Sequence, residues 1–332
     1  MSTHPSLHIH FDSRREADPV FHMTEERVRA ALARRGDIAD RIRVTSSWNL
    51  EGIEVPLGTA DMLVGFRMPK DVIRAAAPAL RNIHLIGAGV EHLRPLDWVP
   101  GQVAITNNRG VHRQKAGEYI LLALLMLNNY IPALATAQRE NVWNPLFSTS
   151  VKGKTALIIG AGELGASGAA EARKLGFRTI GVRRTGQEHP DFDEMHTPDK
   201  LAELLPRADF VLVTVPVTRE TEGMIGEREF ALMKPGAGFI NFGRAKVCDY
   251  AALTRALGSG HLSGAILDVF DPEPLPSESP LWNVRNLFIT PHCSSDDAEA
   301  YIPITLDLVL ENAARMLAGR ELLNVVDLAL EY

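Results

Sequence analysis

The sequence lacks the features that mark several classes of protein. Its 332 residues include only two cysteines, Cys248 and Cys293. They form neither a CxxC pair nor a disulfide framework, which suits a reducing compartment. No apolar run approaches the roughly 18–20 residues of a membrane span, and the first residues lack the basic-then-apolar pattern of a signal peptide. We therefore expect a soluble, cytoplasmic protein with no membrane partner.

Concentrated positive charge is also missing. Lys and Arg number 35 against 41 Asp and Glu, a formal net charge of −6. Because a phosphate backbone requires a basic face, we expect no nucleic-acid partner, and we expect no metal site. The chain is 45% hydrophobic and 23% charged, which excludes disorder. Its length predicts about two domains.

The sequence does contain a regular alternation of β and α patterns. In its centre, short β-branched runs typical of strands are separated by helical stretches. The expected strands are 155–159, 178–182, 210–215, 238–242, 264–269 and 287–290, and the expected helices are 163–175, 198–205 and 250–257. The first third alternates in the same way, and a Leu-rich helix is expected over 115–130. This order predicts an α/β fold with parallel, doubly wound sheets.

A glycine motif opens the central alternation. The run Gly160-Ala161-Gly162-Glu163-Leu164-Gly165 follows a predicted strand and begins a predicted helix, the context in which GxGxxG indicates dinucleotide binding. The first glycine permits a tight turn, the second lets the backbone approach a pyrophosphate, and the third lets the helix pack closely on the strand. The helix N-terminus adds unpaired N–H groups for phosphate. The alternative is a plain glycine turn.

The end of the second central strand decides which dinucleotide we expect. NAD-binding folds place Asp or Glu there to hold the adenosine ribose 2′-hydroxyl. This sequence has Arg183-Arg184-Thr185 instead, and guanidinium groups suit a 2′-phosphate through bidentate hydrogen bonds. The sequence therefore predicts NADP(H) as the preferred coenzyme, with NAD(H) as the second choice. The alternative is that both arginines only cover a solvated strand end.

Polar residues also follow three later strands, at the sheet edge where α/β proteins bind ligands. The stretches are Asn241-Phe242-Gly243-Arg244, Asp268-Val269-Phe270-Asp271-Pro272-Glu273-Pro274 and Thr290-Pro291-His292. Together with the glycine loop they resemble the D-isomer-specific 2-hydroxyacid dehydrogenases over nearly the whole chain, and most closely the glyoxylate/hydroxypyruvate reductase branch. The resemblance implies two Rossmann-like parallel-sheet domains, one flavodoxin-like and one dinucleotide-binding, with an active-site cleft between them.

The resemblance implies a role for each of these polar residues. Arg244 matches the arginine that binds the substrate carboxylate and carbonyl, and Glu273 matches the family's acid. His292 matches the proton donor, and Asp268 an aspartate near the nicotinamide. The chemistry itself needs these residue types. The new alkoxide takes a proton from a group that titrates near neutral pH, a carboxylate orients that group, and an arginine clamps a carboxylate.

Further contacts are predicted in both domains. By the resemblance, Ala88, Gly89 and Val90 present backbone N–H groups to the substrate carboxylate, and Arg67, just after a predicted strand, is another substrate candidate. The predicted coenzyme contacts are Gly160, Gly162, Glu163, Leu164, Gly165, Arg183, Arg184, Thr185, Val215, Pro216, Thr221, Phe242, Gly243 and Asp268.

We expect a substrate domain made of residues 1–106 and 296–332, with an NAD(P)-binding domain, 107–295, inserted between them. The Leu-rich helix and the resemblance favour a homodimer. The expected activity is NADP(H)-dependent reduction of a small 2-keto acid, such as glyoxylate or hydroxypyruvate, to the D-2-hydroxy acid.

Departures from the family pattern leave the substrate open. Ala245 stands where the family usually has glycine, and Cys293-Ser294-Ser295-Asp296 replaces small apolar residues and glycine after the histidine. These residues favour a more polar substrate, and a phosphorylated or dicarboxylic one is conceivable. The remaining alternatives are phosphite or formate oxidation on the same scaffold, and a nucleotide-sensing, corepressor-like binding protein.

Overall fold

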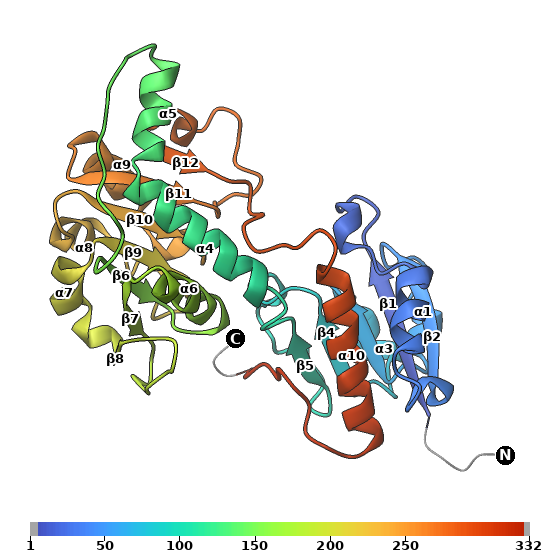
Figure 1. The fold of residues 1–332 in the computed structure, drawn as a ribbon. Coiled ribbons are helices and arrows are strands. Elements are labelled where there is room, and N and C mark those ends of the chain that lie inside the picture. Colours follow the sequence, from blue (N-terminus) through green and yellow to red (C-terminus); the bar gives the residue numbers. More distant parts are fainter. Residues whose placement is uncertain (1–5, 329–332) are drawn as a thin grey trace. The chain divides into compact units, whose positions relative to one another are not determined.

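The computed structural model describes residues 6–328, which form two compact units (Figure 1). One unit runs up to His112 and resumes at Asp297, and Arg113–Asp296 form the other. The second unit is therefore inserted into the first. The boundaries lie at 112/113 and 296/297, where the sequence predicts 106/107 and 295/296. The outer ends of the predicted first domain, residues 1–5 and 329–332, lie outside the described residues.

Within residues 6–328, the first unit is built on a five-stranded parallel sheet in the order β2-β1-β3-β4-β5. Leu7, Ile9 and Phe11 alternate along β1 and join a buried cluster with the helices α1 and α10. The strands are β1 (Leu7–Ser13), β2 (Ile42–Trp48), β3 (Met62–Gly65), β4 (Asn82–Leu85) and β5 (Ala104–Asn107), and the helices are α1 (Glu25–Ala33), α2 (Glu54–Leu57), α3 (Lys70–Ala76) and α10 (Tyr301–Leu317).

The described part of the second unit contains a seven-stranded parallel sheet in the order β12-β11-β10-β9-β6-β7-β8. The six predicted strands are confirmed, with ends shifted by up to two residues. The strands are β6 (Thr155–Ile159), β7 (Arg178–Val182), β8 (Glu194–His196), β9 (Phe210–Val213), β10 (Ala237–Asn241), β11 (Leu262–Leu267) and β12 (Leu287–Ile289).

Helices cover both faces of this second sheet. Side chains of α4 and α6 bury one face, and those of α7, α8 and α9 bury the other, as a doubly wound fold requires. The helices are α4 (Arg113–Asn128), α5 (Ile131–Arg139), α6 (Glu163–Lys174), α7 (Leu201–Leu204), α8 (Glu227–Leu232) and α9 (Tyr250–Gly258). The fold class predicted from the sequence is confirmed.

The Leu-rich helix α4 buries one side only. Gly168 of α6 lets α4 approach closely, because a Cβ there would lie 2.5 Å from a side-chain carbon of Ile120. The opposite side of α4 stays at least partly exposed, with Leu122 47% exposed. No single helix in the described part of the chain is long and apolar enough to cross a membrane; α4 and α5 reach that length and composition only as a pair bent by 63°.

Candidate functional site at the carboxyl edge of the second sheet

The predicted ligand residues of the second unit all follow strands that end at one edge of its sheet. The glycine loop follows β6, Arg183 follows β7, and the segment from Val215 to Thr221 follows β9. Arg244, Asp268 and His292 come after β10, β11 and β12. The strand order reverses between β6 and β9, and α/β proteins bind ligands outside the carboxyl ends of strands at such a switch point.

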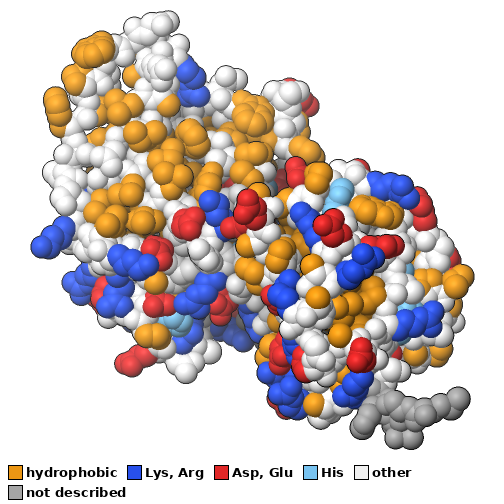
Figure 2. Space-filling view, turned by 45° about the vertical axis from the view of Figure 1, so that its right-hand side comes forward, with side chains coloured by type: hydrophobic (Ala, Val, Ile, Leu, Met, Phe, Trp, Pro, Cys, Tyr) orange, Lys and Arg blue, Asp and Glu red, His pale blue; other side chains and the backbone are white. Residues whose placement is uncertain are grey.

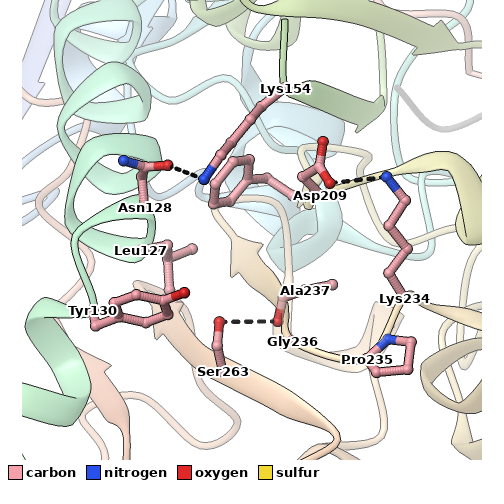
Figure 3. A pocket seen from close by; sticks show the side chains of 11 residues that line it. Leu127, Asn128, Tyr130, Lys154, Asp209, Lys234, Pro235, Gly236, Ala237 and Ser263 are labelled. Carbon is pink, nitrogen blue, oxygen red and sulfur yellow. Dashed lines mark hydrogen bonds and ion pairs between the residues drawn. The ribbon is translucent and has the colours of Figure 1, made fainter. Parts of the chain in front are cut away.

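The opposite, amino edge carries a cavity of 90 Å³ (Figure 3). Lys154 points toward Asn128, to which it donates a hydrogen bond of 2.6 Å, and Lys234 points toward Asp209 at 2.8 Å. Both ammonium groups therefore already have partners within the protein. The described residues that line the cavity include none of the predicted ligand residues, so the candidate site is the carboxyl edge.

Two glycines of the loop are required by packing within the protein. Gly160 has a φ of +112°, and a Cβ there would lie 2.7 Å from the Thr214 hydroxyl. A Cβ on Gly165 would lie 2.2 Å from the carbonyl oxygen of Gly160, so glycine is what lets α6 begin this close to β6. The backbone N–H groups of Gly160 and Ala161 donate to the Val182 carbonyl at 2.9 and 3.1 Å. The loop is thereby tied to the end of β7, one residue before Arg183.

Gly162 has no such internal reason to be glycine. Its backbone is extended, at φ −91° and ψ −161°, a conformation that any residue adopts. A Cβ there would meet nothing within 4 Å. The open space lies at the N-terminus of α6, where unpaired N–H groups and the helix dipole favour an anion. The residues present therefore fit a dinucleotide pyrophosphate.

Arg183 has an unsatisfied donor beside this loop. Its terminal nitrogen donates to the carbonyls of Gln187 and Glu188 at 2.6 and 3.1 Å. Its Nε atom is buried and has no hydrogen-bond partner among the described residues. Buried donors are rarely left unpaired without a functional reason, and a bound anion would supply the acceptor. Arg184 and Thr185 are exposed.

Other predicted coenzyme residues build the loops at this edge. The Thr221 hydroxyl donates to the Pro216 carbonyl at 2.6 Å and accepts from the Thr218 N–H at 2.8 Å, which closes the loop after β9. Glu163 forms an ion pair with Arg113 at 3.1 Å, so its charge is offset at the start of α6. The Leu164 carbonyl accepts from Ser167 within α6 at 2.9 Å.

His292 and Glu273 form a hydrogen-bonded pair. Nδ1 of His292 lies 2.8 Å from one oxygen of Glu273, and the other oxygen accepts the Phe270 backbone N–H at 2.7 Å. The bond from the Phe270 N–H fixes the carboxylate. The carboxylate can therefore orient the imidazole ring, with Nε2 as the ring nitrogen that faces outward. The His292 side chain is 46% exposed and is therefore accessible to a substrate.

The pair shifts both pKa values in the direction that charges it. The hydrogen bond that His292 donates to Glu273 raises the pKa of His292 above its ordinary value, against the opposing effect of burial. Burial raises the pKa of Glu273, but the bonds from His292 and the Phe270 N–H outweigh it, so the net shift is downward. Each shift favours the charged form of its group, so the contact stabilises an imidazolium beside a carboxylate.

Arg244 lies close enough to this pair to influence both members. Its charge helps to lower the pKa of Glu273 and opposes the rise at His292. Asn241 shapes the turn that presents Arg244, since its amide donates to the Arg244 carbonyl at 3.1 Å and accepts from the Gly243 N–H at 3.0 Å. A Cβ on Gly243 would lie 2.6 Å from the Val215 carbonyl, so glycine lets two loops of the edge meet.

Asp268 is buried, and its carboxylate binds the loop that carries His292 through Thr290, Cys293 and Ser294. Tyr119 of α4 also reaches this edge, and sequence reasoning missed it. Its ring meets Phe242 edge-on at 5.8 Å, and burial raises the pKa of its hydroxyl. The only signal for Tyr119 in the sequence was an aromatic residue at the start of the apolar part of this helix.

The predicted substrate residues of the first unit follow neighbouring strands of its own sheet. Ala88 and Val90 come after β4, with the Ala88 carbonyl accepting from Asn107 at 2.7 Å. Arg67 follows β3 and forms an ion pair with Glu16 at 3.1 Å. Its side chain is 53% exposed, so an anion that binds Arg67 has to compete with a carboxylate and with water.

Comparison with known proteins gives consistent matches. Residues 121–294 match the family described as D-isomer specific 2-hydroxyacid dehydrogenase, NAD binding domain. The chain is 34% identical over 228 residues to a glyoxylate reductase of Thermococcus gammatolerans, covering 66% of this chain and 68% of that protein.

Two solved structures cover nearly the whole chain. A D-isomer specific 2-hydroxyacid dehydrogenase from Xanthobacter autotrophicus Py2, in complex with NADPH and MES, has a TM-score of 0.84 and 31% identity, covering 98% of this chain and 100% of that chain. An NADPH-dependent glyoxylate/hydroxypyruvate reductase from Sinorhizobium meliloti, in complex with NADP and sulfate, has a TM-score of 0.81 and 26% identity, again covering 98% and 100%.

The two glycines Gly165 and Gly162 should respond differently to alanine. Gly165→Ala forces a Cβ against the Gly160 carbonyl and should lower the free energy of unfolding by about 1–3 kcal/mol, the usual cost of overpacking. Gly162→Ala should leave the urea unfolding curve unchanged and weaken NADPH binding about tenfold or more, because the new methyl group occupies the ligand's space. Unchanged NADPH affinity in a folded Gly162→Ala protein would contradict this assignment.

Proposed function

We propose that this chain, which belongs to the D-isomer-specific 2-hydroxyacid dehydrogenase family, reduces a small 2-keto acid of the glyoxylate or hydroxypyruvate kind to the D-2-hydroxy acid, with NADP(H) as its preferred coenzyme. The observation that carries the proposal is the 2.8 Å hydrogen bond between His292 and Glu273, at the same sheet edge as the glycine loop. Relatives that are named glyoxylate reductases support the choice of substrate.

A coenzyme held by the glycine loop and Arg183 would supply a hydride for the substrate's carbonyl carbon. His292 then gives the proton on Nε2 to the carbonyl oxygen, where negative charge develops. Glu273 holds Nδ1 at 2.8 Å, which fixes the ring's orientation and stabilises the imidazolium before transfer. Arg244 binds the substrate carboxylate through two parallel hydrogen bonds. In the first unit, the N–H groups of Ala88, Gly89 and Val90 and the side chain of Arg67 are proposed as donors to a carboxylate.

The preference for NADP(H) rests on Arg183 and Arg184. No carboxylate stands at the end of β7 to bind a ribose 2′-hydroxyl; Arg183 occupies that position, and its buried Nε lacks an acceptor among the described residues. A 2′-phosphate supplies that acceptor and a compensating charge. The structural relatives in complex with NADPH or NADP support the same choice.

We also propose that the protein is a homodimer and that the two copies contact each other through the second unit. After α5 the chain runs without helix or strand over 142–150, and it exposes Trp143 at 96% and Phe147 at 89%. Figure 2 shows hydrophobic side chains gathered over the upper part of this unit, around α5. A large exposed apolar patch marks an interaction site, and a two-fold contact would set this patch against its own copy.

Proton donation should appear in the pH dependence. Reduction needs protonated His292, so kcat/KM should fall as pH rises through the pKa of His292, which lies above the ordinary histidine value. Glu273→Gln should move that fall to lower pH, because it removes the main influence that raises the pKa. His292→Gln should lower kcat by about 10²–10⁴-fold while NADPH binding persists. Near-normal turnover in His292→Gln would exclude this role.

Coenzyme choice should depend on Arg183. Arg183→Ala should raise KM for NADPH about 10- to 100-fold, as expected for the loss of charge-assisted hydrogen bonds, and should leave KM for NADH nearly unchanged. Arg178→Ala is the matched control, since Arg178 lies at the amino end of the same strand. A wild-type protein that prefers NADH would show that the coenzyme assignment is wrong.

The dimer should dissociate when its aromatic contacts are removed. The wild-type protein should have a solution mass of twice 36.4 kDa, measured by sedimentation. The double variant Trp143→Ser, Phe147→Ser should be monomeric, because exposed aromatics dominate such contacts. Val55→Ser is the control, as Val55 is 83% exposed in the first unit. A monomeric wild-type protein would rule the dimer out.

A further inference from the structure

Ser294 belongs to the polar run that distinguishes this sequence from its family pattern, and it lies inside the second unit. Its residue surface is 4% exposed. Its hydroxyl donates to Oδ2 of Asp268 at 2.6 Å, and its backbone N–H donates to the same oxygen at 3.2 Å. Ser294 is therefore directed at a buried carboxylate at the end of β11, and its hydroxyl is already engaged there.

Asp268 joins both ends of the loop that carries His292. Its other oxygen, Oδ1, accepts from the Thr290 hydroxyl at 2.6 Å and from the Cys293 N–H at 3.1 Å. Together with the two bonds from Ser294, these contacts from described residues fill the four acceptor positions of a carboxylate. Asp268 is 2% exposed, so these bonds also offset the cost of burying its charge.

His292 needs such support from both sides. It lies between Thr290 and Cys293, and its φ is +50°, a left-handed conformation that residues with a side chain seldom adopt. Such a conformation persists only where the surroundings hold it. The contacts to Asp268 come from Thr290, two residues before His292, and from the two residues after it. Together they fix the backbone of His292 and so the position from which its ring projects.

We propose that Ser294 is a positioning residue, which closes the Asp268 carboxylate onto the loop and so holds His292 within reach of Glu273. The inference rests on the proposed function, because it assigns His292 as the proton donor. In this arrangement Asp268 acts on the histidine by anchoring its loop and by its charge. The polar run after the histidine thereby acquires a role inside the protein.

Three charged groups act on His292 from the surrounding loops: Glu273 and Asp268 favour its protonated form, and Arg244 opposes it. The hydrogen bond that Nδ1 of His292 donates to Glu273 has the largest effect on the pKa, and it depends on the 2.8 Å distance between the two groups. A loosened loop would populate that bond less. Removal of the Ser294 hydroxyl should therefore lower the pKa of His292.

The test is a proton NMR titration of the full-length protein without ligand. The signal of His292, one of 11 histidines, is identified by its absence in His292→Gln. Ser294→Ala should lower the pKa of His292, and Ser263→Ala should not. Ser263 is the matched control because its hydroxyl donates to the Ala237 carbonyl at the amino edge of the same sheet (Figure 3). An unchanged pKa in Ser294→Ala would overturn the proposal.

Kinetics provide the second readout. With glyoxylate and NADPH, Ser294→Ala should lower kcat about 10- to 100-fold, leave KM for NADPH within about twofold, and shift the alkaline fall in kcat/KM to lower pH. A merely structural role would reduce the amount of folded enzyme and leave the pH profile in place. In an Asp268→Asn background, Ser294→Ala should add little, since the two residues act as one unit. If the losses of kcat caused by the two substitutions are fully additive in the double variant, the proposal is contradicted.

The two proposals fail separately. A wild-type protein that does not reduce glyoxylate with NADPH would contradict the proposed function, and the NMR titration would still decide the role of Ser294. If Ser294→Ala does not fold, Thr290→Val takes its place in the titration, because it removes the other hydroxyl from Asp268 while keeping the side chain's shape. If the pKa of His292 in Thr290→Val equals that in the wild-type protein, the inference is overturned.

Discussion

Parallel pairing of the strands is the constraint on which the candidate site depends. A parallel strand cannot return directly to its neighbour, so each one is followed by a crossover, and all strands of a sheet end at the same edge. Gly160 and His292 are far apart in the sequence, yet they follow β6 and β12 of one sheet. The chemistry is thereby assembled from loops, while helices cover both faces of the sheet that holds those loops.

Charge at this edge is placed residue by residue within a mildly acidic chain. Arg183 and Arg244, to which the proposed function assigns a phosphate and a carboxylate, each follow the end of a strand. Negative groups stand where a cation has to be stabilised, at Glu273 and Asp268 around His292. The net charge of −6 conceals this arrangement. It sums all charged residues, and many of these form exposed ion pairs that contribute little to stability.

Much of the fold could be predicted because β-branched runs and glycine stops are local signals. The strands from 155 to 159 and from 178 to 182 were predicted to the residue. The short strand β8, Glu194-Met195-His196, was missed because it is a partly exposed edge strand without a hydrophobic pattern. The helix α8 was missed because it is only six residues long and has a single buried residue, Phe230.

The candidate site could likewise be predicted from the sequence only in part. The resemblance to the family indicated Arg244, Glu273 and His292, and the chemistry requires residues of those types. Sequence could not reveal that Arg183 turns part of its guanidinium to the carbonyls of its own loop, or that Asp268 is saturated by Thr290, Cys293 and Ser294. Both features depend on how loops close after the sheet has formed, which no local pattern encodes.

The divided first unit also orders the steps of biosynthesis. Helix α10 supplies Ile302, Leu306 and Val309 to the same buried cluster as Leu7 and Ile9 of β1, so that core is incomplete until α10 has left the ribosome. The inserted unit, Arg113–Asp296, is continuous and is synthesised whole before α10 appears. The apolar face of β1 that α10 covers therefore gains its partner only after the whole inserted unit has been synthesised.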